Sequence, residues 1–432
     1  MNGSGWFLSV RLAIKRIYRG VLHRSLKPIS RAAFELLRAL QLAARPFILL
    51  KIDTFNSGRI GHLLSEYEEV INQSAAKSDE ARFRNIIFFP RNPCNRYLNS
   101  RVMEQFRQLP SAIIVDVGRN PFLRFLALGG SQLRARYFQG KVAEPYYAGP
   151  RTNGGLFMSN KHISNGPSLT LSESEMDDGW ALLEDLGLQR SRPLICIHVR
   201  DNAYLPGLTY HDYRDPPLRG YEDLARYLLN EGFNVVRTGS AANQPMAINS
   251  SAFLDYPFSD IKSDLMDLFM YAACELAVAG SISGIDFIPV ALRKPLVICD
   301  LRPLLLPSYA ADKSLIIFSL LRWTETESVL SLAEMSQNIR FFTEEYFELG
   351  IEIVPNTSEE IVGAVKEHIS RVMENTEPDQ IALSRQEETL KIYLSQFSVP
   401  GARVAQMPGP ESLPIFGRDF LERHWIELGL SK

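Results

Sequence analysis

The chain has 432 residues, of which 46% are hydrophobic and 22% charged, and its formal net charge is −2. This length exceeds one ordinary hydrophobic core and predicts two domains, at roughly 100–200 residues per domain. Residues 1–45 contain nine Lys and Arg and one acid, which leaves 38 basic and 48 acidic residues elsewhere. An acidic body argues against a nucleic-acid-binding protein, and the basic N-terminus predicts a local electrostatic contact.

The cysteines and the apolar stretches indicate the cellular compartment in which the protein is expected. Cys94, Cys196, Cys274 and Cys299 have no CxxC spacing, and three of them lie in apolar runs, so we expect reduced core residues of a cytosolic protein. No apolar stretch reaches the ~20 residues of a bilayer crossing, and residues 1–10 lack the basic start and cleavage site of a signal peptide. We therefore expect a cytoplasmic chain, neither secreted nor transmembrane.

In chain order, the first predicted elements are basic amphipathic helices. Apolar residues recur at helical spacing over 7–24, with Arg and Lys mostly on the opposite face, Pro28 breaks the pattern, and residues 29–45 repeat it. Such helices can lie in the headgroup layer of an anionic membrane. Packing on the body and docking to a partner are the alternatives. Residues 7–45 thus predict peripheral contact with the inner face of the cell membrane.

Short apolar strands separated by helices follow from Pro46 onward. They predict a first α/β domain over 47–165, after the helical segment 1–46. The expected strands are 47–52, 85–90 and 112–117, and the expected helices are 61–72 and 98–108. Residues 130–168 are rich in Gly, Pro and Asn and lack periodicity, so we expect an irregular connection there.

The second predicted domain, 166–375, begins at a helix whose Ser172 and Glu175 have capping-box spacing. Strands and helices then alternate, which predicts a parallel, Rossmann-like sheet covered on both faces. The expected strands are 194–199, 234–237, 276–280 and 296–300, and the expected helices are 219–230, 263–274, 284–292 and 358–374. Residues 376–432 are expected to form a helical tail.

The end of the strand at 194–199 is the most informative stretch for function. The apolar run LICIHV ends in a cluster of polar residues in which His198, Arg200, Asp201 and Tyr204 would emerge. Ligands of open α/β sheets bind beyond the carboxyl ends of the strands, and a guanidinium matches phosphate oxygens. Arg200 is therefore the first candidate for a diphosphate, and pairing with a nearby carboxylate is the structural alternative. His198 lies within the strand, and we interpret it as a brace for the loop.

Three strand-to-helix turns are further candidates. In the first, Gly58 and Gly61 let the backbone approach a ligand, or form only a tight connection. In the second, Ser281, Ser283 and Gly284 combine hydroxyls with a helix N-terminus, which predicts a phosphate site, although Ser283 can be an ordinary N-cap. The third places Arg237 at a strand end. Together with Arg200 it would complete a site for a dianion.

Several motifs of other enzyme classes are absent from the sequence. No Asp-x-Asp follows an apolar strand, and no His, Cys and carboxylate cluster has metal-ligand spacing, which disfavours a metal-dependent mechanism. No GxSxG elbow and no GxxxxGK[ST] loop occurs. Serine hydrolase and P-loop NTPase activities therefore have no support, and we expect no cofactor.

Several sequence motifs occur in order between about Phe47 and Val372. They are GRIGHL (58–63), NRYL (95–98), Gly179-Trp180, CIHVRDNAYL (196–205), DYR (212–214), NVVRTG (234–239) and the stretch from Lys262 to Ile298. In this order they resemble a bacterial family of glycosyltransferases implicated in surface polysaccharide assembly. A looser likeness extends to fucosyltransferases and heptosyltransferases of the two-Rossmann GT-B type. Asp215-Pro216-Pro217 replaces a more usual Asn-containing turn, and Ile282 follows Gly280-Ser281.

The resemblance implies a GT-B-like fold of two Rossmann-like domains facing a cleft, with a nucleotide-sugar donor on the second domain and a glycan or lipid-linked glycan acceptor on the first. Arg200, Arg237 and Ser281–Gly284 would bind the diphosphate. His62, placed at the cleft, is the candidate catalytic base, with Asp53 and Glu66 as alternatives. The competing hypotheses are a non-catalytic scaffold at the membrane and a nucleotide-sugar epimerase or hydrolase.

Overall fold

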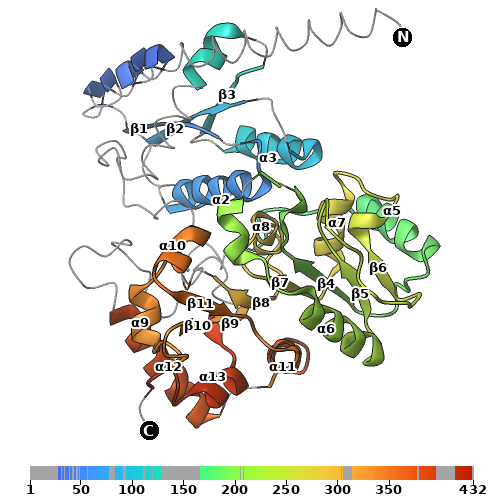
Figure 1. Ribbon diagram of the computed structural model, residues 1–432. Helices are drawn as coiled ribbons and strands as arrows, with labels where there is room; N and C mark the ends of the chain where they lie inside the picture. Colours follow the sequence, from blue (N-terminus) through green and yellow to red (C-terminus); the bar gives the residue numbers. More distant parts are fainter. Residues whose placement is uncertain are drawn as a thin grey trace, which may run out of the picture. The chain divides into compact units, whose positions relative to one another are not determined.

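The computed structural model divides the chain into two compact units, Met1–Gly154 and Gly155–Lys432 (Figure 1). Each unit contains its own parallel sheet, which confirms the predicted α/β class. The described residues are 28–30, 32–33, 35–37, 39–40, 43–44, 47, 49–55, 57–76, 83–90, 94–109, 112–118, 120–127, 166–204, 206–207, 209–302, 304, 314–376, 379–395 and 414–430. The helix predicted over 7–24 lies outside them. The finer division into four segments stays a prediction.

The first unit is a three-stranded parallel sheet in the order β1-β2-β3. Its elements are β1 (Leu49–Thr54), α2 (Ile60–Ala76), β2 (Phe83–Phe89), α3 (Arg96–Gln108) and β3 (Ala112–Asp116). Asn95 caps α3 by accepting a hydrogen bond from the Leu98 backbone N–H at 2.8 Å, which satisfies one of the free donors of the helix start. All the strands and helices predicted here are present, with bounds that differ by at most four residues.

The described residues between 28 and 44 are helical. Ala33 and Leu37 pack against a buried cluster that contains Phe88 and Val117 of the first unit. None of the described helices combines the length and apolar character that a bilayer crossing requires.

The described strands of the second unit form a seven-stranded parallel sheet in the order β12-β9-β8-β7-β4-β5-β6. The strands are β4 (Leu194–Val199), β5 (Asn234–Arg237), β6 (Phe253–Asp255), β7 (Leu276–Gly280), β8 (Leu296–Leu301), β9 (Ser314–Phe318) and β12 (Ile415–Phe416). Nearly every residue of β4, β5, β7 and β8 is buried, because a parallel sheet is covered on both faces. A separate antiparallel pair joins β10 (Leu320–Trp323) to β11 (Ile351–Val354).

Helices cover this sheet on both faces (Figure 1). The described helices of the second unit are α5 (Glu173–Asp185), α6 (Leu218–Asn230), α7 (Met266–Ala273), α8 (Phe287–Ala291), α9 (Leu332–Gln337), α10 (Thr343–Glu348), α11 (Ser358–Met373), α12 (Gln380–Ser395) and α13 (Arg418–His424). The predicted capping box of α5 is present: Ser172 accepts from the Glu175 N–H, and Glu175 accepts from the Ser172 N–H at 2.8 Å. Three short 3₁₀ helices lie in turns beyond the carboxyl ends of strands. They are η2 (Asn202–Tyr204) and η3 (Thr209–Arg214) after β4, and η5 (Gly284–Asp286) after β7.

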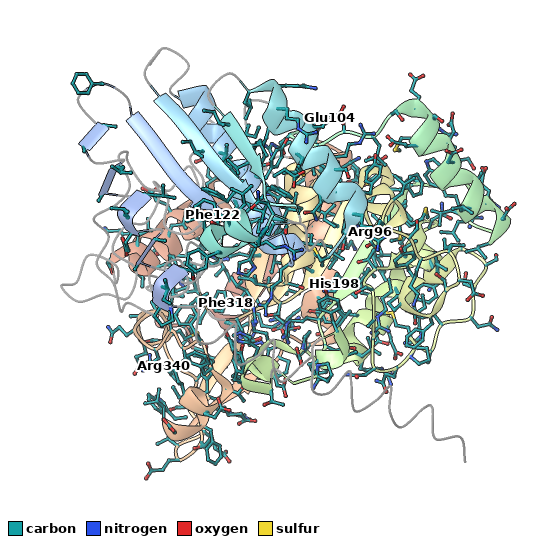
Figure 2. All side chains as sticks on the ribbon, turned by 90° about the horizontal axis from the view of Figure 1, so that it is seen from above. Arg96, Glu104, Phe122, His198, Phe318 and Arg340 are labelled. Carbon is teal, nitrogen blue, oxygen red and sulfur yellow. The ribbon has the colours of Figure 1, made fainter. Side chains whose placement is uncertain are left out.

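The segment after α12 differs from the predicted helical tail, because its β12 adds an edge strand to the sheet. Ile415 and Phe416 pair in parallel with Leu315 and Ile316 of β9. The ring of Phe318, labelled in Figure 2, contacts Phe416 and Phe420 at centroid distances of 5.9 and 4.9 Å. This aromatic cluster attaches α13 to the core.

Candidate functional site

The topology of the large sheet predicts where a ligand would bind. From β4 the chain continues outward to β5 and β6, and then returns to the other side of β4 to form β7, β8 and β9. In open α/β sheets, ligands bind where the strand order reverses in this way, outside the carboxyl ends of the strands. That point lies between β4 and β7. The register pairs Val199 with Gly280, so the next residues, Arg200 and Ser281, emerge side by side.

Arg200 forms an ion pair with Asp215, and both side chains reach the surface, with 15% and 20% of their areas exposed. Burial and the neighbouring guanidinium of Arg214 lower the pKa of Arg200 to about 10. The side chain therefore remains a cation at neutral pH. The structural alternative considered for Arg200, a carboxylate partner, is present, and the residue follows directly after the carboxyl end of β4.

Arg214, at the end of η3, is a second cation at this position. Its Nη1 donates a long hydrogen bond of 3.5 Å to the Ile282 carbonyl, within the turn after β7. Its Nε is buried and has no hydrogen-bond partner in the part of the chain that the structure describes. The backbone N–H of Tyr213 donates to Thr343 Oγ1 at 3.1 Å, which fixes η3 against α10. Arg214 belongs to the DYR motif of the sequence, for which no functional role was predicted.

The turn after β7 begins with a strained and buried residue, Ser281. Ser281 has φ 65°, its side chain is fully buried, and its N–H donates to the Cys299 carbonyl at 2.7 Å. Among the described residues, its Oγ has no hydrogen-bond partner. A left-handed backbone at a non-glycine residue costs about 1–3 kcal/mol and is common at functional sites.

Ser283 forms a reciprocal cap with Asp286, and its N–H donates to Asp286 Oδ2 at 2.6 Å. Burial raises the pKa of Asp286 to about 8, against the lowering effects of that N–H and of Arg214. The helix predicted over 284–292 is a 3₁₀ turn followed by the five-residue α8. Its dipole at Gly284 is correspondingly small, because the macrodipole sums over aligned peptide units.

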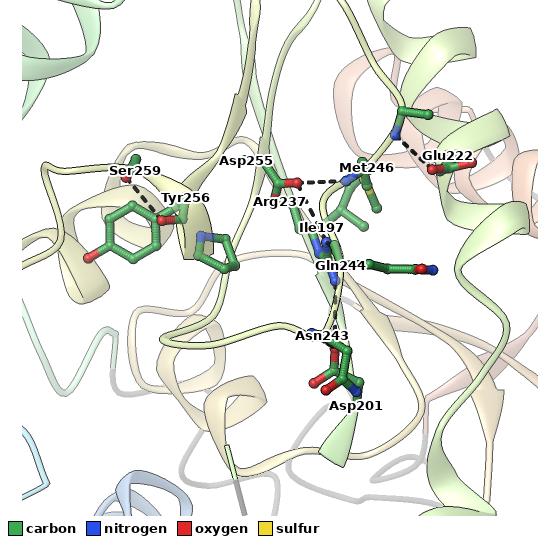
Figure 3. A network of polar contacts seen from close by, with 12 residues as sticks. Ile197, Asp201, Glu222, Arg237, Asn243, Gln244, Met246, Asp255, Tyr256 and Ser259 are labelled. Atoms are coloured by element: carbon green, nitrogen blue, oxygen red, sulfur yellow. Dashed lines mark hydrogen bonds and ion pairs between the residues drawn. The ribbon is translucent and has the colours of Figure 1, made fainter. Parts of the chain in front are cut away.

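The guanidinium of Arg237 is held inside the protein, in contrast to the role predicted for it (Figure 3). Only 2% of the residue is exposed, and Nη1 donates to the Gln244 carbonyl at 2.7 Å. Its guanidinium nitrogens lie 3.5 Å from a carboxylate oxygen of Asp255 and 3.9 Å from one of Asp201. The β5–β6 register pairs Arg237 with Asp255. These contacts stabilise the β5 and β6 ends, and Arg214, rather than Arg237, accompanies Arg200 at the switch point.

The other residues predicted around Arg200 occupy separate positions. His198, labelled in Figure 2, donates from Nδ1 to the Thr238 carbonyl at 3.3 Å. Burial lowers its pKa to about 4, so the ring is neutral at pH 7 and links β4 to the end of β5, the kind of contact that a brace makes. Asp201 accepts from the backbone N–H groups of Ala203 and Asn243 at 3.0 and 2.8 Å. Tyr204 is exposed on η2.

A buried network at the end of β8 was missed by sequence reasoning. Tyr221 donates to Asp300 Oδ2 at 2.7 Å, and the Asn356 N–H donates to Asp300 Oδ1 at 2.7 Å. Asp300 has φ 52°, and the register of β7 with β8 places it beside Ser281. A Cβ on Gly280 would lie 2.9 Å from Tyr221 Cζ and Oη. Glycine is therefore required at 280 for Tyr221 to cross β7.

In the first unit, the predicted residues follow the β1–α2 turn. Gly58 lies in the turn, and Gly61 and His62 lie in the first turn of α2, with His62 exposed. Glu66 is buried one turn later. Asp53 lies in β1, and its side chain is outside the described part. The catalytic role of each stays a prediction.

Among the described residues, no group of three or more His, Cys, Asp or Glu side chains is placed to hold a metal ion.

Comparisons with known proteins give structural resemblances only. No family model and no curated protein matches the chain. A glycosyl transferase family 9 structure from Veillonella parvula DSM 2008 matches with 11% identity and a TM-score of 0.43, over 74% of this chain and 97% of the other. The E. coli heptosyltransferase WaaC with ADP matches with 10% identity and a TM-score of 0.27, over 62% and 90%. The calicheamicin glycosyltransferase CalG4 matches with 10% identity and a TM-score of 0.25, over 92% and 94%. Because similar folds host unrelated functions, the function is inferred below from the site's own residues.

Proposed function

We propose that the protein is a glycosyltransferase that takes a sugar from a nucleotide-sugar donor. The observation that carries this proposal is the adjacency of Arg200 and Ser281 at the switch point, with Arg214 bonded to the same turn. Two guanidinium groups at such a crevice suit the oxygens of a diphosphate. The donor diphosphate would contact Arg200 and Arg214, while Arg237 supports the neighbouring strand ends.

The proposed reaction follows from the positive charges of Arg200 and Arg214 at the carboxyl ends of β4 and β7. Transfer at the anomeric carbon leaves a nucleoside diphosphate whose negative charge grows as the bond breaks, and fixed cations stabilise that charge. Metal-independent leaving-group stabilisation is part of the proposal. The acceptor hydroxyl oxygen forms the new bond to the anomeric carbon, and a base takes its proton as it attacks. His62 is preferred over Glu66 for this role because its side chain is exposed and that of Glu66 is buried.

Ligand-dependent thermal unfolding tests the donor site. A nucleoside diphosphate at 100 times its Kd should stabilise the protein by about 2.7 kcal/mol, a shift of a few degrees. We expect the shift with one nucleotide of a panel, its loss in Arg200→Ala and Arg214→Ala, and its retention in Arg190→Ala, whose partner is the exposed Asp177. No shift with any nucleotide, in folded protein, would favour the scaffold hypothesis.

The acceptor and the reaction type need separate tests. Turnover that requires an added glycan or lipid-linked glycan acceptor supports transfer. Consumption of a nucleotide sugar by the purified protein alone would instead favour an epimerase or hydrolase. Full turnover by His62→Ala would remove that residue from the role of base.

We further propose that the N-terminal segment binds an anionic membrane surface and brings the enzyme to its acceptor in surface polysaccharide biosynthesis. Ile29, Leu36 and Leu40 of the helical segment are 60%, 64% and 59% exposed, while Ala33 and Leu37 are used for packing. The chain around these apolar residues is basic, as in helices that lie on anionic lipid.

Vesicle co-sedimentation tests this contact. Replacing Ile29, Leu36 and Leu40 by Ser should abolish sedimentation with vesicles that contain anionic lipid, whereas the exposed Ile426→Ser should not. Equal sedimentation of the triple variant would exclude this face as the membrane contact.

A further inference from the structure

Charges of both signs meet at the end of β4. The guanidinium of Arg200 interacts electrostatically with the charges of Arg214, Asp212 and Asp201. It forms an ion pair with Asp215. The carboxylates differ in their partners. Asp201 accepts hydrogen bonds from two backbone N–H groups. Oδ1 of Asp212 and Oδ1 of Asp215 each lack a hydrogen-bond partner within the described chain, and the Asp215 oxygen is in ion-pair contact with Arg200 Nη1. Asp215 alone of these three is in ion-pair contact with Arg200 in the described structure.

The backbone holds Asp215 beside the turn after β7. Its N–H donates to the Asp212 carbonyl at 2.9 Å, and the residue before a proline is restricted to extended conformations. Pro216 is buried, and its Cγ lies 3.1 Å from the position that a Cβ on Gly280 would take. The carboxylate therefore neutralises Arg200 next to Ser281, the position proposed for a ligand phosphate.

We propose that Asp215 is an internal counter-ion that competes with the ligand diphosphate for Arg200, leaves it when the ligand binds, and returns when the diphosphate product departs. The inference rests on the proposed diphosphate site. A tethered carboxylate acts at an effective concentration of the order of millimolar or more, so it weakens the binding of every anion that needs Arg200. Its return also favours release of the product, a step that limits turnover in many enzymes.

Isothermal titration with inorganic pyrophosphate tests the exchange. Asp215→Asn keeps the size of the side chain and an oxygen acceptor but removes the charge. We expect it to tighten pyrophosphate binding about tenfold, equivalent to about 1.4 kcal/mol. Asp212→Asn is the matched control, because it removes a nearby charge without removing an ion pair, and we expect a smaller gain of about two- to threefold because screening weakens charges that are not in contact. Asp215→Ser should act in the same direction as Asp215→Asn, so one folded variant of the two is sufficient.

A double-mutant cycle separates this inference from the site itself. In an Arg200→Ala background, Asp215→Asn should no longer tighten binding. If Arg200→Ala alone leaves the Kd unchanged, the diphosphate site is wrong. If Arg200→Ala weakens binding but Asp215→Asn weakens it too, Asp215 orients Arg200 and the exchange is refuted. Equal gains from Asp212→Asn and Asp215→Asn would also refute it, since net charge would then explain both.

Discussion

Replacement of Gly280 by Ala is expected to destabilise the second unit through Tyr221. The new Cβ would lie 2.9 Å from both Cζ and Oη of the fully buried Tyr221 side chain and 3.1 Å from Pro216 Cγ. The ring cannot rotate away freely, because its hydroxyl donates to the buried Asp300 at 2.7 Å. Relief of the contact therefore requires movement of α6 or loss of that hydrogen bond.

Two contributions set the magnitude. Overpacking of a well-packed core costs about 1–3 kcal/mol, and a hydrogen bond to a charged group contributes about 1.5–3 kcal/mol. Together they predict a loss of about 2.5–6 kcal/mol in the free energy of unfolding. For a unit of this size, the midpoint of thermal unfolding should fall by roughly 5–20 °C.

Urea unfolding of Gly280→Ala and two companions tests the reasoning. Gly363→Ala is the control, since a Cβ there meets nothing within 4 Å and an alanine inside α11 should raise stability by about 0.5–1 kcal/mol. In a Tyr221→Phe background, Gly280→Ala should cost less, because one of the two close ring atoms is gone. A cost below about 0.5 kcal/mol, or a cost unchanged by Tyr221→Phe, would refute the steric account.

Three further predictions concern residues at the carboxyl ends of β5 and β7. Native Asp286, with a pKa of about 8, keeps its proton while the unfolded chain loses it from about pH 4 upward. Asp286→Asn should therefore gain stability relative to the natural protein as the pH rises from 4 to 8, by at most about 6 kcal/mol. Parallel pH profiles of the two proteins in urea unfolding would contradict this. Ser281→Gly relieves the left-handed backbone and removes an unpartnered hydroxyl, so thermal unfolding should show equal or higher stability, by up to about 1 kcal/mol, while an unchanged pyrophosphate Kd would remove Ser281 from ligand contact. Arg237→Met leaves Asp255 without its cation and should cost about 3–5 kcal/mol in urea unfolding, partly recovered by adding Asp255→Asn; a loss below about 1 kcal/mol would show that the buried ion pairs contribute little.

The sequence predicts strands well where an apolar run is bounded on both sides. Strands β4, β5, β7 and β8 agree with their predictions to within one residue. The run from Ser314 to Trp323 contains two strands of different sheets, separated by Ser319. Both strands were missed, because a continuous apolar run carries no period that locates the break.

The same limit explains the outcome for Arg237. Its partner Asp255 lies in β6, a three-residue strand that is too short for a periodic signal. Without β6, the pairing of these residues cannot be seen, and an arginine at a strand end resembles a ligand contact. The alternation of strands and helices predicts a parallel sheet, whose carboxyl strand ends all lie on one side, so Arg200 and Ser281 could be expected on the same side of the sheet, and the β4–β7 register makes them neighbours. Arg214 lies in a 3₁₀ helix, for which the sequence offers no comparable pattern.

The β9–β12 pairing also bears on how the chain folds during synthesis. Leu315 of β9 pairs with Ile415 of β12, which is synthesised about 100 residues later, so this edge of the sheet stays incomplete until then. At about 5–20 residues per second, that delay is on the order of 5–20 s. Over this interval β9 would present free backbone N–H and C=O groups and the apolar ring of Phe318, the properties of an edge that pairs with other chains. Nascent or truncated chains that end before β12 should therefore be prone to aggregation and should bind chaperones that recognise apolar segments.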